Sequence, residues 1–167
     1  TVGSYGAGKK TGDSQSYDEE GHLIWKEKFL NDFPVRRERI LQNGKPQVLE
    51  ETEGTGPAQT FCRTYYHENG VHSSYECSTK ERGFFGTPHG QTFIWNPAGK
   101  VIVQGQFVEG KRAGRWVYFA EDGVKVRGDA VYSKGELERE MYINREEKTV
   151  RREYFPDGSL KKETIGD

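Results

Sequence analysis

The most regular chemical pattern in the sequence is a symmetric set of two cysteines and two histidines: Cys62, His67, His72 and Cys77. A hairpin that turns at Asn69-Gly70 would bring the two cysteines opposite each other. Cysteine and histidine are also the ligands of structural zinc sites, but residues 62 and 67 differ by an odd number and should point to opposite faces of a strand. We therefore expect a disulfide, and neither a metal nor a cofactor.

The position of the cysteine pair carries an objection to the disulfide. Counting outward from a two-residue turn places the pair at a hydrogen-bonded site, where the Cα atoms are about 5.5 Å apart. A disulfide is less comfortable there than at a narrow pair, and a bulge would change the count. The alternative is two reduced, half-buried thiols.

Two further patterns resemble catalytic motifs. Residues 3–11 approach the phosphate-binding loop, but Lys10 stands where that motif needs Ser or Thr, and no helix is expected after it. Carboxylate runs at residues 18–20, 50–53 and 146–147 fall in predicted turns and polar linkers, where charges are solvated. Catalysis would need a carboxylate in an apolar pocket, so we expect no enzyme.

A glycine recurs six times, each four positions after a large apolar residue. The glycines are Gly21, Gly44, Gly70, Gly99, Gly123 and Gly158, and the apolar residues are Tyr17, Ile40, Tyr66, Trp95, Phe119 and Tyr154. Asn-Gly and Asp-Gly steps favour two-residue type I′ turns, which predicts hairpin turns near 20–21, 43–44, 69–70, 98–99, 122–123 and 157–158. A degenerate unit is expected near 142–148, with Tyr142 as its aromatic residue and Glu146 at the glycine position.

The segments between these turns complete the predicted fold. Gly-rich stretches at residues 8–12, 86–90 and 110–116 are interpreted as reversals between hairpins, and residues 47–59 as an extended acidic loop. A single hairpin cannot bury its own apolar face, so hairpins should stack side by side. We expect an all-β fold, an elongated antiparallel array of about six to seven stacked hairpins that forms a twisted single-layer sheet, in one domain spanning residues 1–167.

A family resemblance accompanies this pattern. Residues 104–123, from Gln-Gly-Gln-Phe-Val-Glu-Gly-Lys to Tyr-Phe-Ala-Glu-Asp-Gly, resemble the bacterial MORN-repeat variant, and residues 153–161 look like the same unit again. The resemblance covers roughly residues 6–164 and is strongest at 90–127. It implies a hairpin array without catalytic machinery that contacts proteins or membranes, in a family that includes antitoxin-like proteins.

Composition and charge narrow the expected partners. Aromatic residues reach 13% and glycine 21 residues, which fits a thin fold and not a disordered chain. Lys plus Arg number 25 against 26 for Asp plus Glu, so there is no positive field to attract nucleic acid. Outward aromatic and arginine side chains are typical of protein interfaces. The candidate partner-binding residues are Tyr65, Trp95, Arg115, Trp116, Tyr118, Arg151, Arg152 and Phe155; the alternative is that the aromatic residues among them build the core.

The leading functional hypothesis is a non-catalytic scaffold for protein–protein interaction, as an immunity or antitoxin-like partner or an envelope protein. The alternative is a membrane-surface scaffold that binds acidic phospholipids through basic pairs at residues 9–10, 111–112 and 151–152. No apolar stretch approaches the ~20 residues that span a bilayer. The disulfide predicts a periplasmic, outer-membrane-associated or secreted protein, with the cytoplasm as the alternative.

Overall fold

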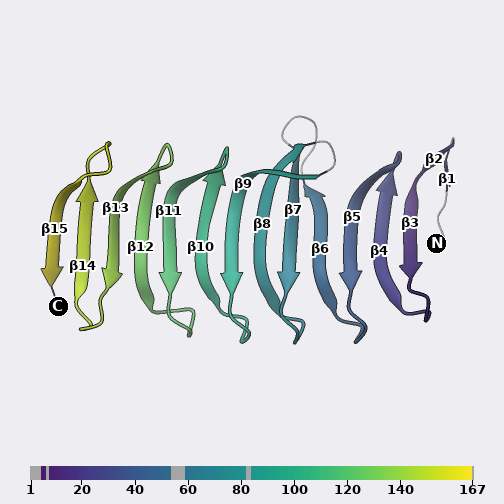
Figure 1. Cartoon of the computed structure of the whole chain (residues 1–167), viewed down its shortest axis with the longest axis horizontal. Helices are drawn as coiled ribbons and strands as arrows, with labels where there is room; N and C mark the ends of the chain where they lie inside the picture. Colours follow the sequence, from purple (N-terminus) through teal and green to yellow (C-terminus); the bar gives the residue numbers. More distant parts are fainter. Residues whose placement is uncertain (1–4, 7, 54–58, 82–83, 167) are drawn as a thin grey trace. The chain divides into compact units, whose positions relative to one another are not determined.

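The structure is a computed structural model that describes residues 5–6, 8–53, 59–81 and 84–166. Its elements are strands: β1 (Tyr5–Gly6), β2 (Lys9–Lys10), β3 (Gly12–Tyr17), β4 (Leu23–Leu30), β5 (Phe33–Ile40), β6 (Pro46–Glu53), β7 (Thr60–Tyr66), β8 (His72–Glu81), β9 (Phe84–Trp95), β10 (Val101–Val108), β11 (Lys111–Phe119), β12 (Val126–Ser133), β13 (Glu136–Ile143), β14 (Thr149–Tyr154) and β15 (Leu160–Gly166). Strands β3 to β15 form one open antiparallel sheet in sequence order, and β1 pairs with β2 (Figure 1). The predicted all-β, single-layer hairpin array is confirmed.

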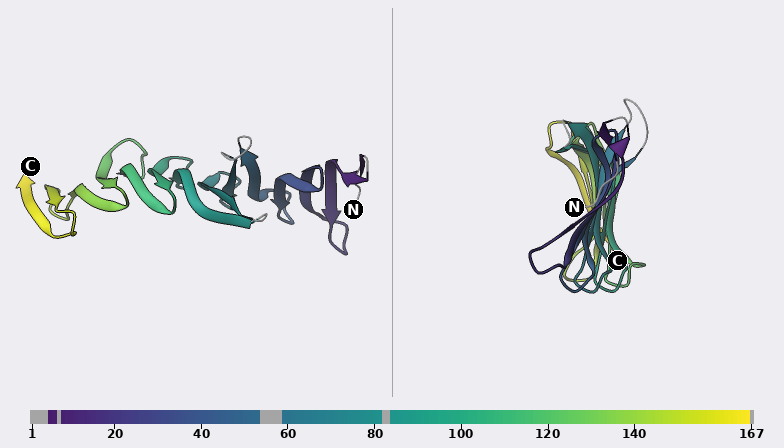
Figure 2. Two further views of the ribbon diagram at one scale, coloured as in Figure 1. Left: turned by 90° about the horizontal axis from the view of Figure 1, so that it is seen from above. Right: turned by 90° about the vertical axis from the view of Figure 1, so that its right-hand side faces the viewer.

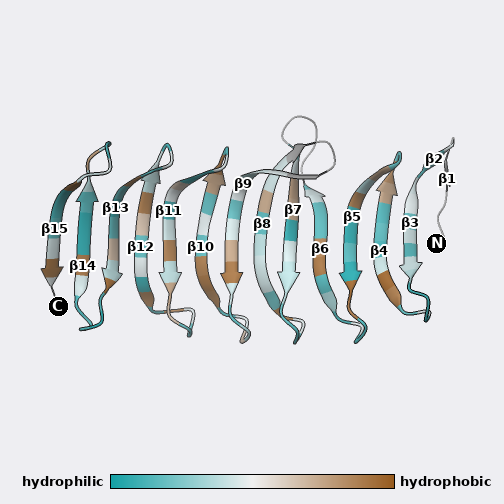
Figure 3. Ribbon diagram, viewed as in Figure 1, coloured by the Kyte–Doolittle hydropathy of each residue, from teal (hydrophilic) through white to brown (hydrophobic). Residues whose placement is uncertain are grey.

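The chain divides into two compact units, Thr1–Thr87 (unit 1) and Pro88–Asp167 (unit 2), which are described separately below. Within each unit the described strands lie in a single layer, and no second layer of described residues covers either face (Figure 2). Polar and apolar residues alternate along many of the strands (Figure 3). Side chains of both faces must therefore reduce their own exposure by packing across neighbouring strands. The assignment of all repeats to one domain stays a prediction.

The hairpin turns differ from the predicted type I′ geometry. At the β7–β8 turn, Gly70 N donates to His67 O at 2.8 Å and His67 N donates to Val71 O at 2.8 Å. Gly70 has a φ of +86°, whereas Asn69 is not among the residues with positive φ. The loop is thus one residue longer than a two-residue turn, and only the glycine needs a left-handed backbone. The other five recurring glycines also have positive φ, between +71° and +87°, and four of their turns share these bonds. The β11–β12 turn is one residue longer, because Ala120 N donates to Lys125 O.

An Asn or Asp side chain stabilises each of these turns from one of two positions. Asn69 Oδ1 stands just before the glycine and accepts from Val71 N at 3.0 Å. In the β9–β10 turn Asn96 occupies the first turn position instead, and its Oδ1 accepts from Ala98 N at 3.1 Å and Lys100 N at 3.0 Å. Such side-chain bonds mimic a backbone turn. A turn therefore tolerates Ala or Glu before its glycine when Asn or Asp begins it.

The degenerate unit exists, but its predicted positions are wrong by one residue. The β13–β14 turn places Glu147, with φ +58°, in the glycine position, where Glu146 was expected. Glu147 N donates to Asn144 O at 3.1 Å. The residue four positions before Glu147 is Ile143, so Ile143 and not Tyr142 matches the apolar position. The position four residues before the glycine equivalent is therefore apolar in each of these units, but it is not always aromatic.

The turn at Gly158 lies at the other end of its strands. It joins β14 to β15, whereas the Glu147 turn joins β13 to β14, so the two turns cap opposite ends of β14 (Figure 1). Three of the described connections at that end are tighter. Asn31-Asp32, Glu109-Gly110 and Lys134-Gly135 each have positive φ at both residues, as type I′ turns require. Type I′ turns are thus present, but most of the turns predicted to have this geometry lie at the opposite ends of the strands.

Three predicted loops are mostly strand. Residues 86–90 lie within β9 and do not reverse the chain, and residues 111–116 lie within β11. In the acidic stretch 47–59, residues up to Glu53 belong to β6, which pairs with both β5 and β7. Residues 54–58 lie outside the described residues.

Few apolar side chains are buried in either unit. The buried apolar side chains of unit 1 are Ile40, Phe61, Cys62 and Cys77, and those of unit 2 are Trp116, Val117, Ala130 and Val150. Of the aromatic candidates for partner binding outside this core, Phe155 is exposed, while Tyr65, Trp95 and Tyr118 are half-buried.

Candidate interaction surfaces

The predicted disulfide is present between Cys62 and Cys77, in adjacent strands β7 and β8. The Cα atoms lie 4.0 Å apart, which matches a narrow pair and not the wide pair that a two-residue turn implied. A register shift after Tyr65 changes the alternation between turn and cysteines while keeping Cys62 opposite Cys77. Because both sulfurs are in the disulfide, they cannot serve as zinc ligands. A disulfide favours a compartment outside the reducing cytoplasm.

A tyrosine and a carboxylate lie beside the disulfide. Tyr75 Oη lies 3.1 Å from Cys77 Sγ and donates to Glu53 Oε1 at 3.1 Å. Burial of the ring, together with the negative charge of Glu53, raises the pKa of Tyr75 to about 12. The phenol thus stays neutral through the physiological range, and the cluster is structural in character.

One face of unit 1 carries a ladder of alternating charges directly opposite one another across five strands. Its members are Glu27, Arg37, Glu50, Arg63 and Glu76. Glu50, at 8% exposure, is the buried centre: Arg63 Nε donates to its Oε1 at 2.8 Å, and Arg37 Nη1 lies 3.6 Å from its Oε2. The expectation that this carboxylate is solvated in a linker is wrong, since β6 holds it between two arginines.

One face of unit 2 carries an aromatic cluster centred on Trp116. The Trp116 ring lies against Gly105, where an added Cβ would clash with its Cδ2 atom. The Phe107 ring meets it edge-on at 5.1 Å, and the Arg112 guanidinium lies 4.5 Å from its centre. Arg112 also donates to Tyr132 Oη at 3.0 Å. These groups take the place of a second layer over the indole.

Trp116 is therefore wrong as a partner-binding residue, because only 3% of it is exposed and its Nε1 already donates to Gln106 O. Arg152 is largely committed as well: its Nε donates to Glu163 at 2.6 Å and its Nη1 lies 3.5 Å from Glu140. Tyr118 is half-buried on the same face. These three side chains belong to the internal packing of unit 2.

The remaining candidates do not form one surface. Tyr65 is half-buried in unit 1. In unit 2, Trp95 packs on Phe93 with ring centres 5.6 Å apart, and Phe155 is 47% exposed in the β14–β15 turn. Arg115 and Arg151 are exposed and share the face opposite to Trp116, as strand alternation places them. Which of the arginines share a face cannot be predicted from local sequence, because it depends on the positions of the bulges.

This arginine face contains two adjoining hollows. A hollow of about 490 Å³ is lined by Arg115, Val131, Arg139, Met141 and Arg151, together with carboxylates that include Asp129 and Glu153. It shares Arg115 with a hollow of about 300 Å³ that Gln91, Gln104 and Gln106 also line. We call this continuous surface the arginine groove. A separate hollow of about 570 Å³ is lined by residues of both faces, Leu137 and Tyr154 among them, and is not part of the groove.

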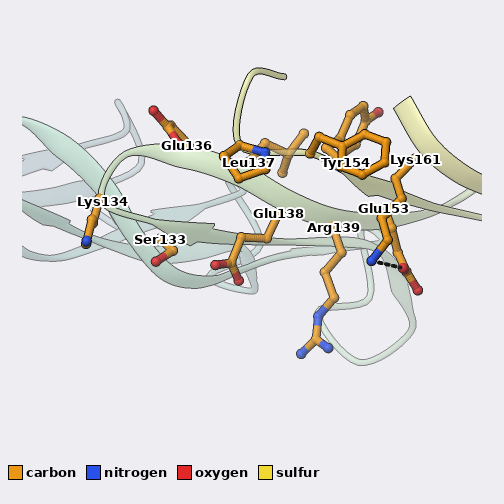
Figure 4. Close-up of a pocket in the computed structure, with 11 residues that line it drawn as sticks. Ser133, Lys134, Glu136, Leu137, Glu138, Arg139, Glu153, Tyr154 and Lys161 are labelled. Atoms are coloured by element: carbon orange, nitrogen blue, oxygen red, sulfur yellow. Dashed lines mark ion pairs between the residues drawn. The ribbon is translucent and has the colours of Figure 1, made fainter. Parts of the chain in front are cut away.

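The arginines of the groove differ in how far they are paired. Arg115 Nε donates to Asp129 Oδ2 at 2.8 Å. Within the described part of the chain, no carboxylate forms an ion pair with Arg139 or Arg151. Of these two residues, only Arg151 was a candidate from the sequence. Figure 4 shows Arg139 extending to the side of the strand opposite Leu137 and Tyr154, while Glu153 pairs with Lys161. Two free guanidinium groups thus face a hollow.

The basic pairs proposed for lipid contact are dispersed. In unit 2, Lys111 and Arg112 begin β11 beside its turn, whereas Arg151 and Arg152 lie in the middle of β14 and point to opposite faces. The two pairs therefore do not share an edge. Lys10 in unit 1 lies 3.6 Å from the ring centre of Phe29. Among the described residues there is no helix of the length and hydrophobicity needed to cross a membrane.

One exposed group of potential metal ligands occurs in the β3–β4 turn of unit 1. Atoms of Asp18, Glu20 and His22 lie within 4.8 Å of one another. Asp18 Oδ1 already accepts from His22 N at 2.7 Å and Glu20 N at 3.1 Å, as the turn requires. The hydrogen bond from the His22 backbone N–H is the main cause that lowers the pKa of Asp18. The group is accounted for by turn formation.

No family model matches the chain, and no curated protein matches it.

Proposed function

We propose that the chain is a non-catalytic repeat scaffold that binds another protein, and that the arginine groove of unit 2 is the contact surface. One observation carries the proposal: Arg139 and Arg151 face the central hollow without a carboxylate partner among the described residues. Unpaired guanidinium groups beside exposed apolar surface are typical of protein interfaces, where arginine and methionine are enriched.

The floor of the groove supports this function. Val131 and Met141 are half-buried between the arginines and offer apolar area that a partner can cover. The backbone beneath them belongs to paired strands, so the groove is held rigidly and loses little conformational entropy on binding. An immunity or antitoxin-like role, or one in a bacterial envelope, is a specific form of the proposal that rests on the family resemblance.

The disulfide supports a location for this interaction. A bond between Cys62 and Cys77 would persist in the periplasm, on an outer membrane or after secretion, where thiols are oxidised. We propose one of these compartments, with the cytoplasm as the alternative. Mass spectrometry of the protein isolated from its native compartment with thiols blocked checks this assignment, and two free thiols would contradict it.

Photo-crosslinking tests the contact surface. A photoreactive amino acid replaces Val131 in the groove, and in a matched variant it replaces Val124, which is 80% exposed in the β11–β12 turn. We expect a defined protein adduct in the native compartment from position 131 and not from position 124. The purified adduct protein should then bind the full chain in calorimetry. Equal labelling at both positions, or no binding by the purified protein, would refute the proposal.

The lipid-binding alternative has its own measurement. Sedimentation with vesicles that contain phosphatidylserine should leave the protein in the supernatant at physiological salt, because its formal charge is −1 and its basic pairs are dispersed. Vesicle binding that falls steeply with salt would favour the membrane-surface scaffold instead.

A further inference from the structure

The arginine groove has the chemistry of a site for an extended acidic peptide. We propose that it binds a segment of the partner protein that lies across strands β11 to β14 and places carboxylates against Arg115, Arg139 and Arg151. This inference rests on the proposed function and specifies the partner: a protein segment with spaced Asp or Glu residues.

The register of the strands fixes the spacing of the cations. Arg115, Val131 and Arg139 are direct cross-strand neighbours in succession, so Arg115 and Arg139 stand two strands apart. Two strand separations amount to about 10 Å. Arg139 lies opposite Glu153, which makes Arg151 its diagonal neighbour at about 7–8 Å. The three arginines therefore form a bent row of two unequal steps, the first directly across the strands and the second diagonal to them.

An extended peptide can meet all three arginines from one of its faces. Its residues advance about 3.3 Å each and its side chains alternate between two faces, so side chains on the same face lie about 7 Å apart at alternate positions. Carboxylates at alternate positions would thus match the step from Arg139 to Arg151, and the long side chain of Arg115 can reach the third carboxylate across the wider step. Arginine suits this role because it binds a carboxylate through two parallel hydrogen bonds.

The acidic residues of the groove select against a uniform polyanion. Asp129 is bound to Arg115, and Glu153 forms an ion pair with Lys161 at 3.7 Å. A chain of phosphates would bring its charges close to both carboxylates, at an electrostatic cost. A peptide can place neutral residues at these points. Together with a net charge of −1, this favours a protein segment over nucleic acid or a lipid surface.

The glutamine end of the groove suits the peptide backbone. Gln91 pairs with Gln106 across β9 and β10, and Gln104 lies on the same face. Each carboxamide offers both donors and an acceptor, as an extended backbone with unpaired N–H and C=O groups requires. Gly105, between Gln104 and Gln106, also lines this hollow. The peptide would continue from the arginines onto these amides through Arg115.

Fluorescence anisotropy with synthetic peptides tests the inference on the full chain. The probe is a labelled, terminally blocked peptide whose three glutamates stand at alternate positions, with Thr and Val between them. One control peptide carries glutamine in place of glutamate, and a second carries the three glutamates consecutively. We expect the spaced acidic probe to bind most tightly, and equal affinity for the glutamine peptide would overturn the inference.

Matched substitutions identify the site. R139Q combined with R151Q should weaken binding of the probe by roughly tenfold or more, the usual effect of losing a charged hydrogen bond. R139K with R151K keeps the charge but not the paired donors, so binding should fall less. The control is R145Q with K100Q, which removes the same charge from exposed turns of unit 2 and should change affinity less than about twofold. Equal losses in the two glutamine pairs would contradict a specific site.

The outcomes separate this inference from the proposed function. If R139Q with R151Q abolishes probe binding and the adduct at position 131, both statements gain support. If the adduct persists in that variant, the groove binds a protein but not through acidic residues, and only the present inference fails. If neither a probe nor an adduct is seen, both fail. Phosphatidylserine vesicles that bind the chain and displace the probe would replace the peptide by a lipid surface.

Discussion

The two units stabilise a single-layer sheet by different means. Unit 1 aligns opposite charges across its strands, with Glu50 buried between Arg37 and Arg63, and closes its last hairpin with the disulfide. Unit 2 lays large side chains flat across its strands, with Trp116 filling the space above Gly105. A sheet face without a second layer can therefore be closed by charge pairs within the face or by aromatic rings that cover glycine.

The difference also bears on where a partner can bind. In unit 1 the charged side chains of the ladder form ion pairs with one another. In unit 2 the aromatic cluster packs on one face, and on the other face Arg139 and Arg151 have no carboxylate partner among the described residues. A face whose charges are already paired has little electrostatic attraction left for a ligand. We therefore expect substitutions in the ladder and the aromatic cluster to change stability, and substitutions in the arginine groove to change binding.

Removing the indole of unit 2 should have the largest effect. We expect Trp116→Ala to lower the free energy of unfolding of unit 2 by about 3–5 kcal/mol, the usual cost of deleting a buried large aromatic side chain. Urea unfolding followed by circular dichroism measures it. Trp95→Ala, at a half-buried ring, is the control and should cost less. A loss below about 1 kcal/mol for Trp116→Ala would mean that the cluster does not hold the unit together.

Removing the disulfide should have the next largest effect, and in unit 1. The bond closes a loop with a sequence separation of 15 residues, for which the chain-entropy model gives about 3 kcal/mol. Cys62→Ser combined with Cys77→Ser should lower the melting temperature, and reductant should do the same to the natural chain. Reductant must leave the double variant unchanged. Equal melting of the oxidised and reduced chain would contradict a stabilising disulfide.

The charge ladder should contribute less than either. Glu50→Gln keeps the shape but removes the charge shared by Arg37 and Arg63, and we expect a loss of about 1–2 kcal/mol because both arginines can partly regain water. The matched control is Glu51→Gln, on the opposite face, where a more exposed pair with Arg36 should contribute less than about 1 kcal/mol. Equal losses in the two variants would show that the buried centre is not special.

The turns should contribute alike in both units. Nothing lies within 4 Å of an added Cβ at Gly44 in unit 1 or Gly158 in unit 2, and their φ angles are +78° and +82°. Alanine at either position should cost about 1 kcal/mol through backbone strain alone. Gly166→Ala, without a positive φ, is the control and should change stability little. Unequal costs at Gly44 and Gly158 would show that the turns depend on their unit.

These turns also show how far the sequence determines the fold. The six glycines predicted hairpins correctly, but a step such as Asn69-Gly70 is compatible with a two-residue turn and with the longer turn observed. The two turn types can be distinguished only from all four residues of the turn, and not from the Asn-Gly step alone. Asn96-Pro97-Ala98-Gly99 and Asn144-Arg145-Glu146-Glu147 share Asn at the first position, which identifies Glu147 as the glycine equivalent.

The surfaces were less predictable than the hairpins. Alternation places each side chain on a face only between bulges, and the register shifts between Gln104 and Gln106 and between Val131 and Tyr132 interrupt it. Trp116 was therefore assigned to a partner surface although it is buried. Arg139 has no sequence feature of its own; it becomes a candidate only when the strands place it beside Arg151. Cross-strand neighbours are a property of the sheet, not of local sequence.

The smallest expected effect concerns pH and compares one tyrosine in each unit. In unit 1, burial is the main cause that raises the pKa of Tyr75 from 10.0 to about 12. A raised pKa means that folding favours the neutral phenol, so this contribution is complete below pH 10 and is lost as the pH rises to 12. In unit 2 the pKa of Tyr154 is also raised, chiefly by its hydrogen bond to Glu140 and only secondarily by burial.

Urea unfolding in steps from pH 9 to 12 measures this difference, with Tyr75→Phe and Tyr154→Phe as matched variants. Phenylalanine cannot ionise, so the stability of Tyr75→Phe should fall less than that of the natural chain over this range. Tyr154→Phe should follow the natural chain more closely, because its phenol can regain water when it ionises. Absorbance at high pH should show one tyrosine that titrates late and is missing in Tyr75→Phe. If Tyr154→Phe removes the late titration instead, the hydrogen bond in unit 2 outweighs burial in unit 1.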